Sequence, residues 1–371
     1  MTFLFPVIAY FFPTAHRGKV FGGPFGVDAK GHGSGFSELS ILIPAHNEEK
    51  TLPATLAGIR QALIFMKSVH PSFLGKIFVG ADACTDGTAQ VAVENGADTV
   101  QVLSNRNKWL TLRSLLSAAD IGPWVAFADS AVLWPKDFLV KIEPYILDKQ
   151  TLGLAPACYV NRAGLFGHLA WVTERKLKTI ESFLGGPISI HGPTVIYRTA
   201  GLKNVIAELG DRLWLNDDVV IPLMYRALYP LGRLIYWTGK GPTEWVIDDG
   251  LGERRNDFVR RRRIMLGNLQ WIRHLLCQIF GMNPRAGILA MRRVFRVFWL
   301  YWMLCFMTGL ASLCLNESLT LISLVLLLIL ILIWHWAHPA KKGLRSLLMV
   351  SLLAPYYFWN TNTGKHLSGW K

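Results

Sequence analysis

Short apolar runs alternate with helical stretches over the first half of the chain. The runs read as buried strands, and they cover residues 39–43, 76–80, 100–103 and 123–128. The stretches between them read as helices, and they cover residues 49–67, 86–95 and 108–119. Strands that alternate with helices at this pitch predict βαβ units and a parallel sheet. We therefore expect an α/β domain.

Polar residues gather directly after these strands. The first strand is followed by the sequence AHNEE, the second by ADACTD and the fourth by Asp129-Ser130. In open sheets of this kind, ligands bind outside the carboxyl ends of the strands. The pattern therefore predicts a binding site at this edge of the sheet.

Two long uncharged runs follow in the last quarter of the chain, at 297–315 and 318–337. At 1.5 Å per residue each is long enough to cross a hydrocarbon core of about 30 Å. A third run, 344–359, is shorter and contains Ser351 and Pro355, so it either spans or enters the bilayer and returns. The sequence thus predicts two to three transmembrane helices.

Basic residues flank these runs, and they predict the orientation in the membrane. Arginines precede the first run and lysines follow the second, which places both flanks and the large domain in the cytoplasm. We expect a multi-pass protein of the inner (plasma) membrane. Residues 1–37 hold an apolar run too short to span and a Gly-rich linker, and they read as an interfacial or re-entrant segment. The predicted domains are 1–37, 38–275 and 276–371.

Composition supports this interpretation. Hydrophobic residues make up 51% of the 371 positions, and 39 Lys and Arg stand against 25 Asp and Glu, a net charge of +14. These values exclude a disordered chain and a small disulfide scaffold. The basic excess calls for an anionic partner. Nucleic acid is rejected, because much of the excess lies beside the apolar runs and no recognition motif occurs.

The polar segments form an ordered series. They are Ile43–Glu49 (IPAHNEE), Val79–Thr88 (VGADACTDGT), Phe127–Asp129 (FAD), Asn216–Leu223 (NDDVVIPL), Glu244 and Arg260–Gln270 (RRRRIMLGNLQ). The series resembles the membrane-bound, inverting family 2 glycosyltransferases, a group that includes the hyaluronan, chitin and poly-N-acetylglucosamine synthases and many glycolipid and exopolysaccharide transferases. The resemblance covers about residues 38–275. Each motif alone has low specificity, and their order and spacing make the match specific.

This resemblance implies a GT-A fold and a nucleotide-sugar donor, most often UDP-linked. It implies that Asp129 holds Mg²⁺ or Mn²⁺, although Ala131 stands where relatives often have a second Asp. Glu48, Asp82 and Lys108 match donor-binding positions; for Glu48 and Asp82, the structural alternative is a turn or a helix N-terminal charge.

The later motifs imply the catalytic and acceptor groups. Asp218 matches the base that deprotonates the acceptor hydroxyl, and Asp217 orients a neighbour or the acceptor. Arg260 and Arg263 match a motif near the leaving diphosphate, where a cation stabilises the developing charge. The same arginines could instead form a basic helix face on anionic lipid. The acceptor region is expected at Gly192 and Glu244.

Three interpretations of activity stay open. The first is transfer of one or few sugars to a lipid, lipid-linked saccharide or glycan, which the small number of spans and Ile264 in place of the usual Trp both favour. The second is processive exopolysaccharide synthesis, with an oligomer or a synthase-complex partner completing the channel. The third is a non-catalytic GT-A subunit of a synthase complex, which Ala131 suggests. No residue names the sugar.

Overall fold

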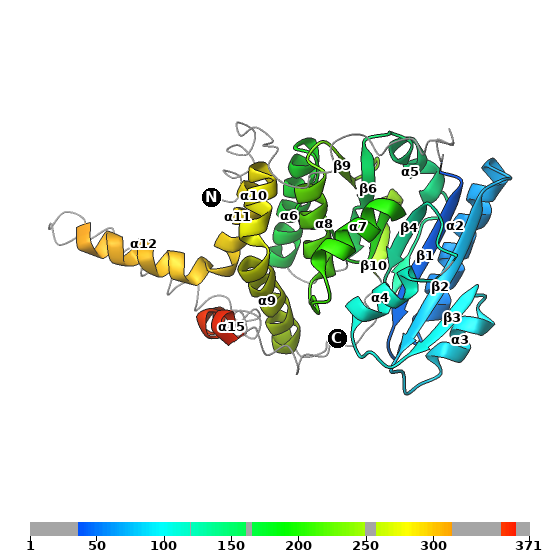
Figure 1. The fold of residues 1–371 in the computed structure, drawn as a ribbon, viewed down its shortest axis with the longest axis horizontal. Coiled ribbons are helices and arrows are strands. Elements are labelled where there is room, and N and C mark those ends of the chain that lie inside the picture. The colour runs from blue at the N-terminus through cyan, green and yellow to red at the C-terminus, as the bar shows by residue number, and fades with distance from the viewer. Residues whose placement is uncertain (1–35, 119, 161–164, 249–256, 314–349, 361–371) are drawn as a thin grey trace. The chain divides into compact units, whose positions relative to one another are not determined.

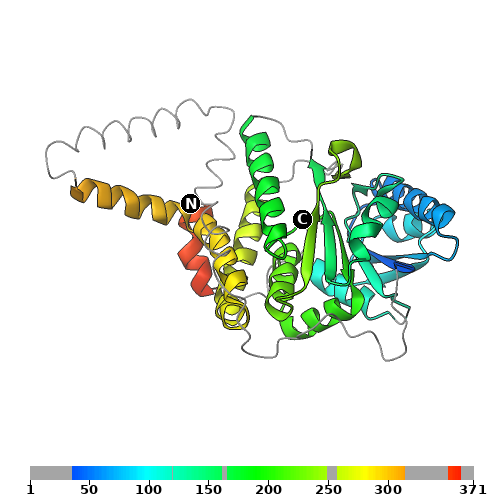
Figure 2. The same ribbon diagram turned by 90° about the horizontal axis from the view of Figure 1, so that it is seen from above.

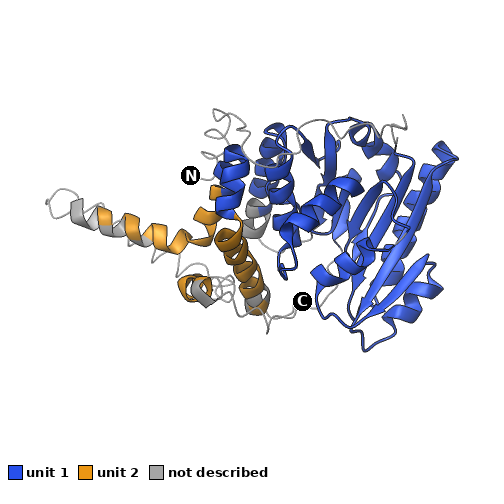
Figure 3. Cartoon of the chain, in the orientation of Figure 1, with its two compact units in different colours: residues 1–253, 276–290, 368–371 blue, residues 254–275, 291–367 orange. Residues whose placement is uncertain are grey.

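The computed structural model describes residues 36–118, 120–160, 165–248, 257–313 and 350–360. The chain forms two compact units (Figure 3). The first contains residues 1–253, 276–290 and 368–371, and the second contains residues 254–275 and 291–367. Residues 254–275 thus belong to the second unit and 276–290 to the first, and the domain bounds expected from the sequence stay a prediction.

The expected alternation of strands and helices is present in the first unit (Figure 1). Its elements are β1 (Glu38–Ala45), α2 (Leu52–Val69), β2 (Leu74–Asp82), α3 (Thr88–Glu94), β3 (Thr99–Leu103), α4 (Lys108–Leu116) and β4 (Trp124–Ala128). The four strands pair in parallel, with β1 between β2 and β4. Strands β1 and β4 are almost completely buried, as expected for strands that helices cover on both faces, whereas the edge strand β3 is mostly exposed or half-buried.

The complete sheet is mixed, which corrects the expectation of a parallel sheet. Its order is β3-β2-β1-β4-β8-β6-β9. The additional strands are β6 (Thr151–Pro156), β8 (Thr194–Arg198) and β9 (Arg233–Trp237). Strand β8 runs antiparallel to both β4 and β6. A second, three-stranded sheet has the order β5-β10-β7 and consists of β5 (Val132–Leu133), β10 (Val246–Asp248) and β7 (Cys158–Val160).

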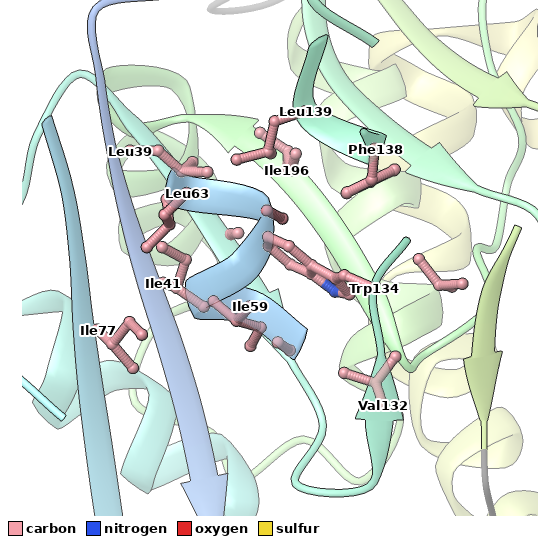
Figure 4. Packing of buried hydrophobic residues seen from close by; sticks show 14 of the residues in the cluster. Leu39, Ile41, Ile59, Leu63, Ile77, Val132, Trp134, Phe138, Leu139 and Ile196 are labelled. Atoms are coloured by element: carbon pink, nitrogen blue, oxygen red, sulfur yellow. The ribbon is translucent and has the colours of Figure 1, made fainter. Parts of the chain in front are cut away.

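Helices lie on both faces of the large sheet (Figure 1 and Figure 2). One face packs on α2 and α5 (Phe138–Ile146) through a buried apolar cluster that includes Leu39, Ile41, Ile59 and Phe138 (Figure 4). Helix α4 packs on β1 and β2 on the other face. Further α-helices among the described residues of this unit are α6 (Leu165–Phe183), α7 (Thr199–Leu209), α8 (Asp217–Leu228), α10 (Leu276–Met282) and the start of α11 (Pro284–Val297).

The second unit contains α9 (Asp257–His274), the rest of α11, α12 (Trp299–Leu313) and α15 (Ala354–Asn360). Arg273 of α9 donates to the carbonyl of Phe358 at 2.8 Å, and Trp299 of α12 donates to the hydroxyl of Ser351 at 3.1 Å. Among the described residues, no helix combines the length and apolar character needed to cross a bilayer. The expected span 318–337 and the N-terminal apolar run lie outside the described residues.

Candidate active site

The loops after β1 and β2 are joined by hydrogen bonds at the carboxyl edge of the sheet. The backbone amide of Thr85 donates to the side-chain oxygen of Asn47 at 2.8 Å, and the amide of Gly87 donates to the Glu49 carboxylate at 2.9 Å. The predicted donor residue Glu48 lies in this junction, and its carboxylate accepts a hydrogen bond from a threonine hydroxyl of its own loop at 2.7 Å. The two loops therefore form one continuous rim.

Left-handed backbone conformations occur after each of the first three strands. Asn47, Ala83 and Arg106 have φ angles of 56°, 51° and 53°. Non-glycine residues in this region cost about 1 kcal/mol or more each, and such residues cluster at functional sites. The sharp turns that they produce bring the ends of the three strands to one rim.

Asp82 is fully buried and holds the loop before α4. Its two carboxylate oxygens accept hydrogen bonds from the backbone amides of Arg106, at 3.0 Å, and Asn107, at 2.8 Å. The His46 ring nitrogen contacts the Asp82 carbonyl at 2.7 Å. The sequence placed Asp82 against the base or ribose of a nucleotide, and that contact stays a prediction. In this structure its carboxylate positions the segment that leads to Lys108.

Lys108 brings two of the predicted acids together. It is the first residue of α4, whose N-terminus is capped by the Asn107 side chain. Its ammonium lies 2.7 Å from the Asp129 carboxylate at the end of β4 and 3.6 Å from the Asp217 carboxylate at the start of α8. The side chains of Lys108, Asp129 and Asp217 are 22%, 32% and 18% exposed, so solvent and ligands can reach them.

The charge on Lys108 is fixed by these acids. Burial alone lowers the pKa of the ammonium, but Asp129, Asp217 and Asp218 together raise that pKa above its ordinary value of 10.5. Lys108 therefore remains a cation throughout the physiological range. It provides a permanent positive charge between the end of β4 and the first turn of α8.

The turn at Gly192 is tied to both acidic elements. The amide of Ile190 donates to the carbonyl of Asp218 at 2.9 Å, and the amide of Asp129 donates to the carbonyl of Pro193 at 2.9 Å. A Cβ built at Gly192 would meet no atom within 4 Å. The predicted acceptor residue Gly192 thus lies between the two acidic elements and faces open space.

Three other predicted residues, Glu244, Arg260 and Arg263, belong to other elements of the chain. Glu244 receives the Lys141 ammonium at 3.1 Å and the Lys240 amide at 2.7 Å. The hydrogen bond from the Lys240 amide lowers the pKa of Glu244 most, and the Lys141 ammonium lowers it further. The Glu244 carboxylate therefore stabilises its own loop. Arg260 and Arg263 belong to α9 in the second unit, so their contact with a diphosphate stays a prediction.

Asp129 is the residue at the rim that we consider as a ligand to a divalent cation. In the part of the chain that the structure describes, no group of three or more His, Cys, Asp or Glu side chains could hold a metal ion. Mg²⁺ usually binds through one or two carboxylates plus substrate phosphates and water. Asp129, partly exposed at the end of β4, fits as a single protein ligand to a cation that a diphosphate also coordinates.

Comparison with known proteins gives the fold. No family model matches the chain. The fold is similar to that of a mannosyltransferase from Pyrobaculum calidifontis, solved in complex with GDP-Man and Mn²⁺, with a TM-score of 0.62 over 95% of this chain and 94% of that one, at 14% identity. The chain has a GT-A fold. This confirms the GT-A part of the expected fold class, whereas the C-terminal transmembrane helices stay a prediction.

Two curated glycosyltransferases are similar in sequence. A dolichyl-phosphate beta-glucosyltransferase of Drosophila melanogaster is 35% identical over 106 residues, which is 26% of this chain and 32% of that protein. A 4,4'-diaponeurosporenoate glycosyltransferase of Staphylococcus haemolyticus is 24% identical over 204 residues, which is 49% of this chain and 51% of that protein. The chain therefore matches between a third and a half of the length of these relatives.

The GT-A unit also contains an aromatic cluster that was not predicted from the sequence. The rings of Trp171 in α6 and His191 stack at 4.1 Å, and the His191 ring nitrogen lies 3.0 Å from the hydroxyl of Tyr236 in β9. The pairing joins residues 20 positions apart, so no local pattern in the sequence could identify it. The cluster supports the turn that contains Gly192.

Proposed function

We propose that this protein is a membrane-associated, inverting glycosyltransferase that moves a sugar from a nucleotide-sugar donor to a lipid acceptor. The observation that carries the proposal is the position of the Lys108 ammonium between Asp129 and Asp217 at the carboxyl edge of a GT-A sheet. This arrangement joins the predicted donor side to the predicted acceptor side through one cation.

The two sides have different chemical tasks. On the donor side, the Lys108 ammonium binds the diphosphate, which gains negative charge as the bond to the sugar breaks. Mg²⁺ or Mn²⁺, when bound at Asp129, supplies further neutralisation of that charge. On the acceptor side, Asp218 accepts the proton of an acceptor hydroxyl as its oxygen attacks the anomeric carbon. The nucleoside diphosphate leaves from the opposite face, so the anomeric configuration inverts.

The likeness to the two curated relatives favours a lipid that ends in an acidic group. Their names specify a phosphate in one case and a carboxylate in the other. We place the head group beside Gly192, where a Cβ would meet no atom within 4 Å. An acidic acceptor presents an oxygen that is already ionised. Transfer of the sugar to such an acceptor therefore depends much less on Asp218 as a base than transfer to a hydroxyl does.

A membrane location is part of the same proposal. The apolar runs 297–315 and 318–337 support it from the sequence. In the second unit, Trp302, Phe306 and Tyr356 have exposed aromatic side chains, which is typical of a surface that contacts lipid. We place the GT-A unit at the cytoplasmic face of the plasma membrane.

Donor turnover by the full chain in lipid nanodiscs tests the proposal. The protein is incubated with UDP-sugars or GDP-mannose, Mn²⁺ and either a polyprenyl phosphate, a long-chain carboxylic acid or a long-chain alcohol. Released nucleoside diphosphate and glycosylated lipid are measured. The variants are Asp129→Asn and Asp218→Asn, with Asp211→Asn as the matched control, because the Asp211 side chain is 97% exposed.

We expect one donor to give glycosylated lipid, and we expect Asp129→Asn to abolish the product while Asp211→Asn retains it. Asp218→Asn should abolish transfer to the alcohol and reduce transfer to the acids much less. Nucleotide binding without release from any donor and acceptor pair would contradict the proposal and favour a non-catalytic GT-A subunit. Equal loss for Asp129→Asn and Asp211→Asn would also contradict it.

A further inference from the structure

The Lys108 ammonium binds the Asp129 carboxylate, which is the group that a divalent cation would need as a ligand. Its ammonium nitrogen is 2.7 Å from the Oδ1 atom of Asp129 and also donates a hydrogen bond to it. The same nitrogen is 3.6 Å from Asp217. An ammonium and a divalent cation repel each other strongly at such distances when both are partly shielded from water. Asp129 therefore cannot hold a metal ion while it holds Lys108 in this way.

The neighbours of Asp129 do not compensate for this competition. Ser130 and Ala131 follow it in the sequence, so the segment supplies no second carboxylate. Both side chains are almost completely buried. A cation at Asp129 must therefore obtain most of its ligands from elsewhere. A diphosphate provides such oxygens, and its negative charge also attracts the ammonium that leaves Asp129.

We propose that Lys108 is the resident counter-cation of Asp129, and that a divalent cation reaches Asp129 only together with a nucleotide diphosphate. Lys108 then gives up Asp129, retains Asp217 and adds its charge to the diphosphate. This inference rests on the proposed function, because it uses the same donor site. It assigns Lys108 a second task, which is to prevent the metal ion from binding before the donor.

Direct measurement of Mn²⁺ binding tests this inference without any turnover. The full chain in nanodiscs is titrated with Mn²⁺, and free Mn²⁺ is followed by electron paramagnetic resonance, with and without UDP or GDP. The variants are Lys108→Met and Lys108→Arg. The matched control is Lys76→Met, since Lys76 also lies between two carboxylates, Asp120 at 2.9 Å and Glu38 at 3.8 Å.

We expect the wild-type protein, Lys108→Arg and Lys76→Met to bind Mn²⁺ weakly without nucleotide and tightly when nucleotide is present. Lys108→Met should bind Mn²⁺ without nucleotide, with an affinity higher than wild type by about tenfold or more, because removal of the ammonium frees Asp129. Thermal unfolding of each variant verifies that it is folded. A Lys108→Met variant that is folded and binds Mn²⁺ alone no better than wild type would overturn the inference.

Wild-type protein that binds Mn²⁺ tightly without nucleotide would overturn it as well. The proposed function fails separately, since a chain that binds no nucleotide has lost its donor. If the chain binds no nucleotide, the Mn²⁺ affinities of wild type and Lys108→Met without nucleotide still decide whether Lys108 prevents Mn²⁺ from binding to Asp129.

Discussion

The backbone amide of Ile190 donates a hydrogen bond to the carbonyl oxygen of Asp218 at 2.9 Å. Three residues later, the carbonyl of Pro193 accepts a hydrogen bond from the amide of Asp129. The turn between them is therefore fixed at one end to the predicted base and at the other end to the predicted metal ligand. A change within this turn acts on both sides of the site.

Gly192→Leu tests the open space in that turn. A Cβ at this position meets no atom within 4 Å, so we expect a side chain to be tolerated there, with a change in the free energy of unfolding of no more than about 0.5 kcal/mol. The side chain would occupy the space proposed for the acceptor, so the KM for the acceptor should rise while nucleotide affinity stays constant. Steady-state kinetics and calorimetry measure both. Gly281→Leu, another glycine that faces open space, is the control.

Lys178→Met tests the support behind the turn. The Lys178 ammonium is buried and donates to the carbonyl and hydroxyl of Ser189, at 2.7 and 2.9 Å. Loss of these bonds should lower the free energy of unfolding by about 1–3 kcal/mol and weaken acceptor binding more than nucleotide binding. Urea unfolding and the two affinities give the answer. Lys176→Met, an exposed neighbour on α6, should change none of them.

Asp82→Asn tests the clamp on the loop before α4. One amide oxygen can replace only one of the two carboxylate acceptors, and the new NH₂ group faces a backbone N–H. We expect a loss of about 1–3 kcal/mol in the free energy of unfolding, together with weaker nucleotide binding, because Lys108 follows this loop. Calorimetry with UDP and GDP measures the second effect. Unchanged stability would show that the clamp is dispensable; Asp120→Asn is the exposed control.

The protein should lose stability as the pH rises above 10. Burial, reinforced by Asp217 and Asp218, raises the pKa of Tyr197, and burial raises that of Tyr225. Above the ordinary value of 10.0 the unfolded chain loses these phenolic protons first, so unfolding becomes more favourable by up to about 1.4 kcal/mol per pH unit for each tyrosine. The raised pKa of Lys108 acts in the same direction above 10.5.

Urea unfolding at several alkaline pH values measures this loss. Tyr197→Phe should make it smaller, and at neutral pH the same variant should be as stable as wild type or more so. Among the described residues, the Tyr197 hydroxyl is buried without a hydrogen-bond partner, so its removal forfeits no bond. The exposed Tyr145→Phe should leave the pH dependence unchanged.

Local patterns were sufficient to predict the first half of the GT-A sheet. Strands β1 to β4 are short apolar runs that end in polar residues, and both signals are visible within a few positions. Lys108 follows Asn107, whose φ of −154° is ordinary extended backbone and whose side chain caps α4.

Pairings between distant segments could not be predicted in this way. Strand β8 inserts beside β4 through the pairing of Ala128 with Thr194, and nothing in the local periodicity of either segment specifies that partner. The two backbone amides that donate hydrogen bonds to Asp82 lie 24 and 25 residues further along the chain. Apolar periodicity identifies an element, whereas its neighbours depend on the packing of the whole sheet.

The joined loops after β1 and β2 have a consequence for the rate at which the rim opens. The amides of Thr85 and Gly87 are held by side chains of the opposite loop, so neither loop can separate without breaking the other's bonds. Their exchange with deuterium should therefore follow a single rate, set by one concerted opening. A nucleotide that binds across the rim should slow the exchange of both amides to the same extent. The exchange rate of this pair therefore reports donor binding and release.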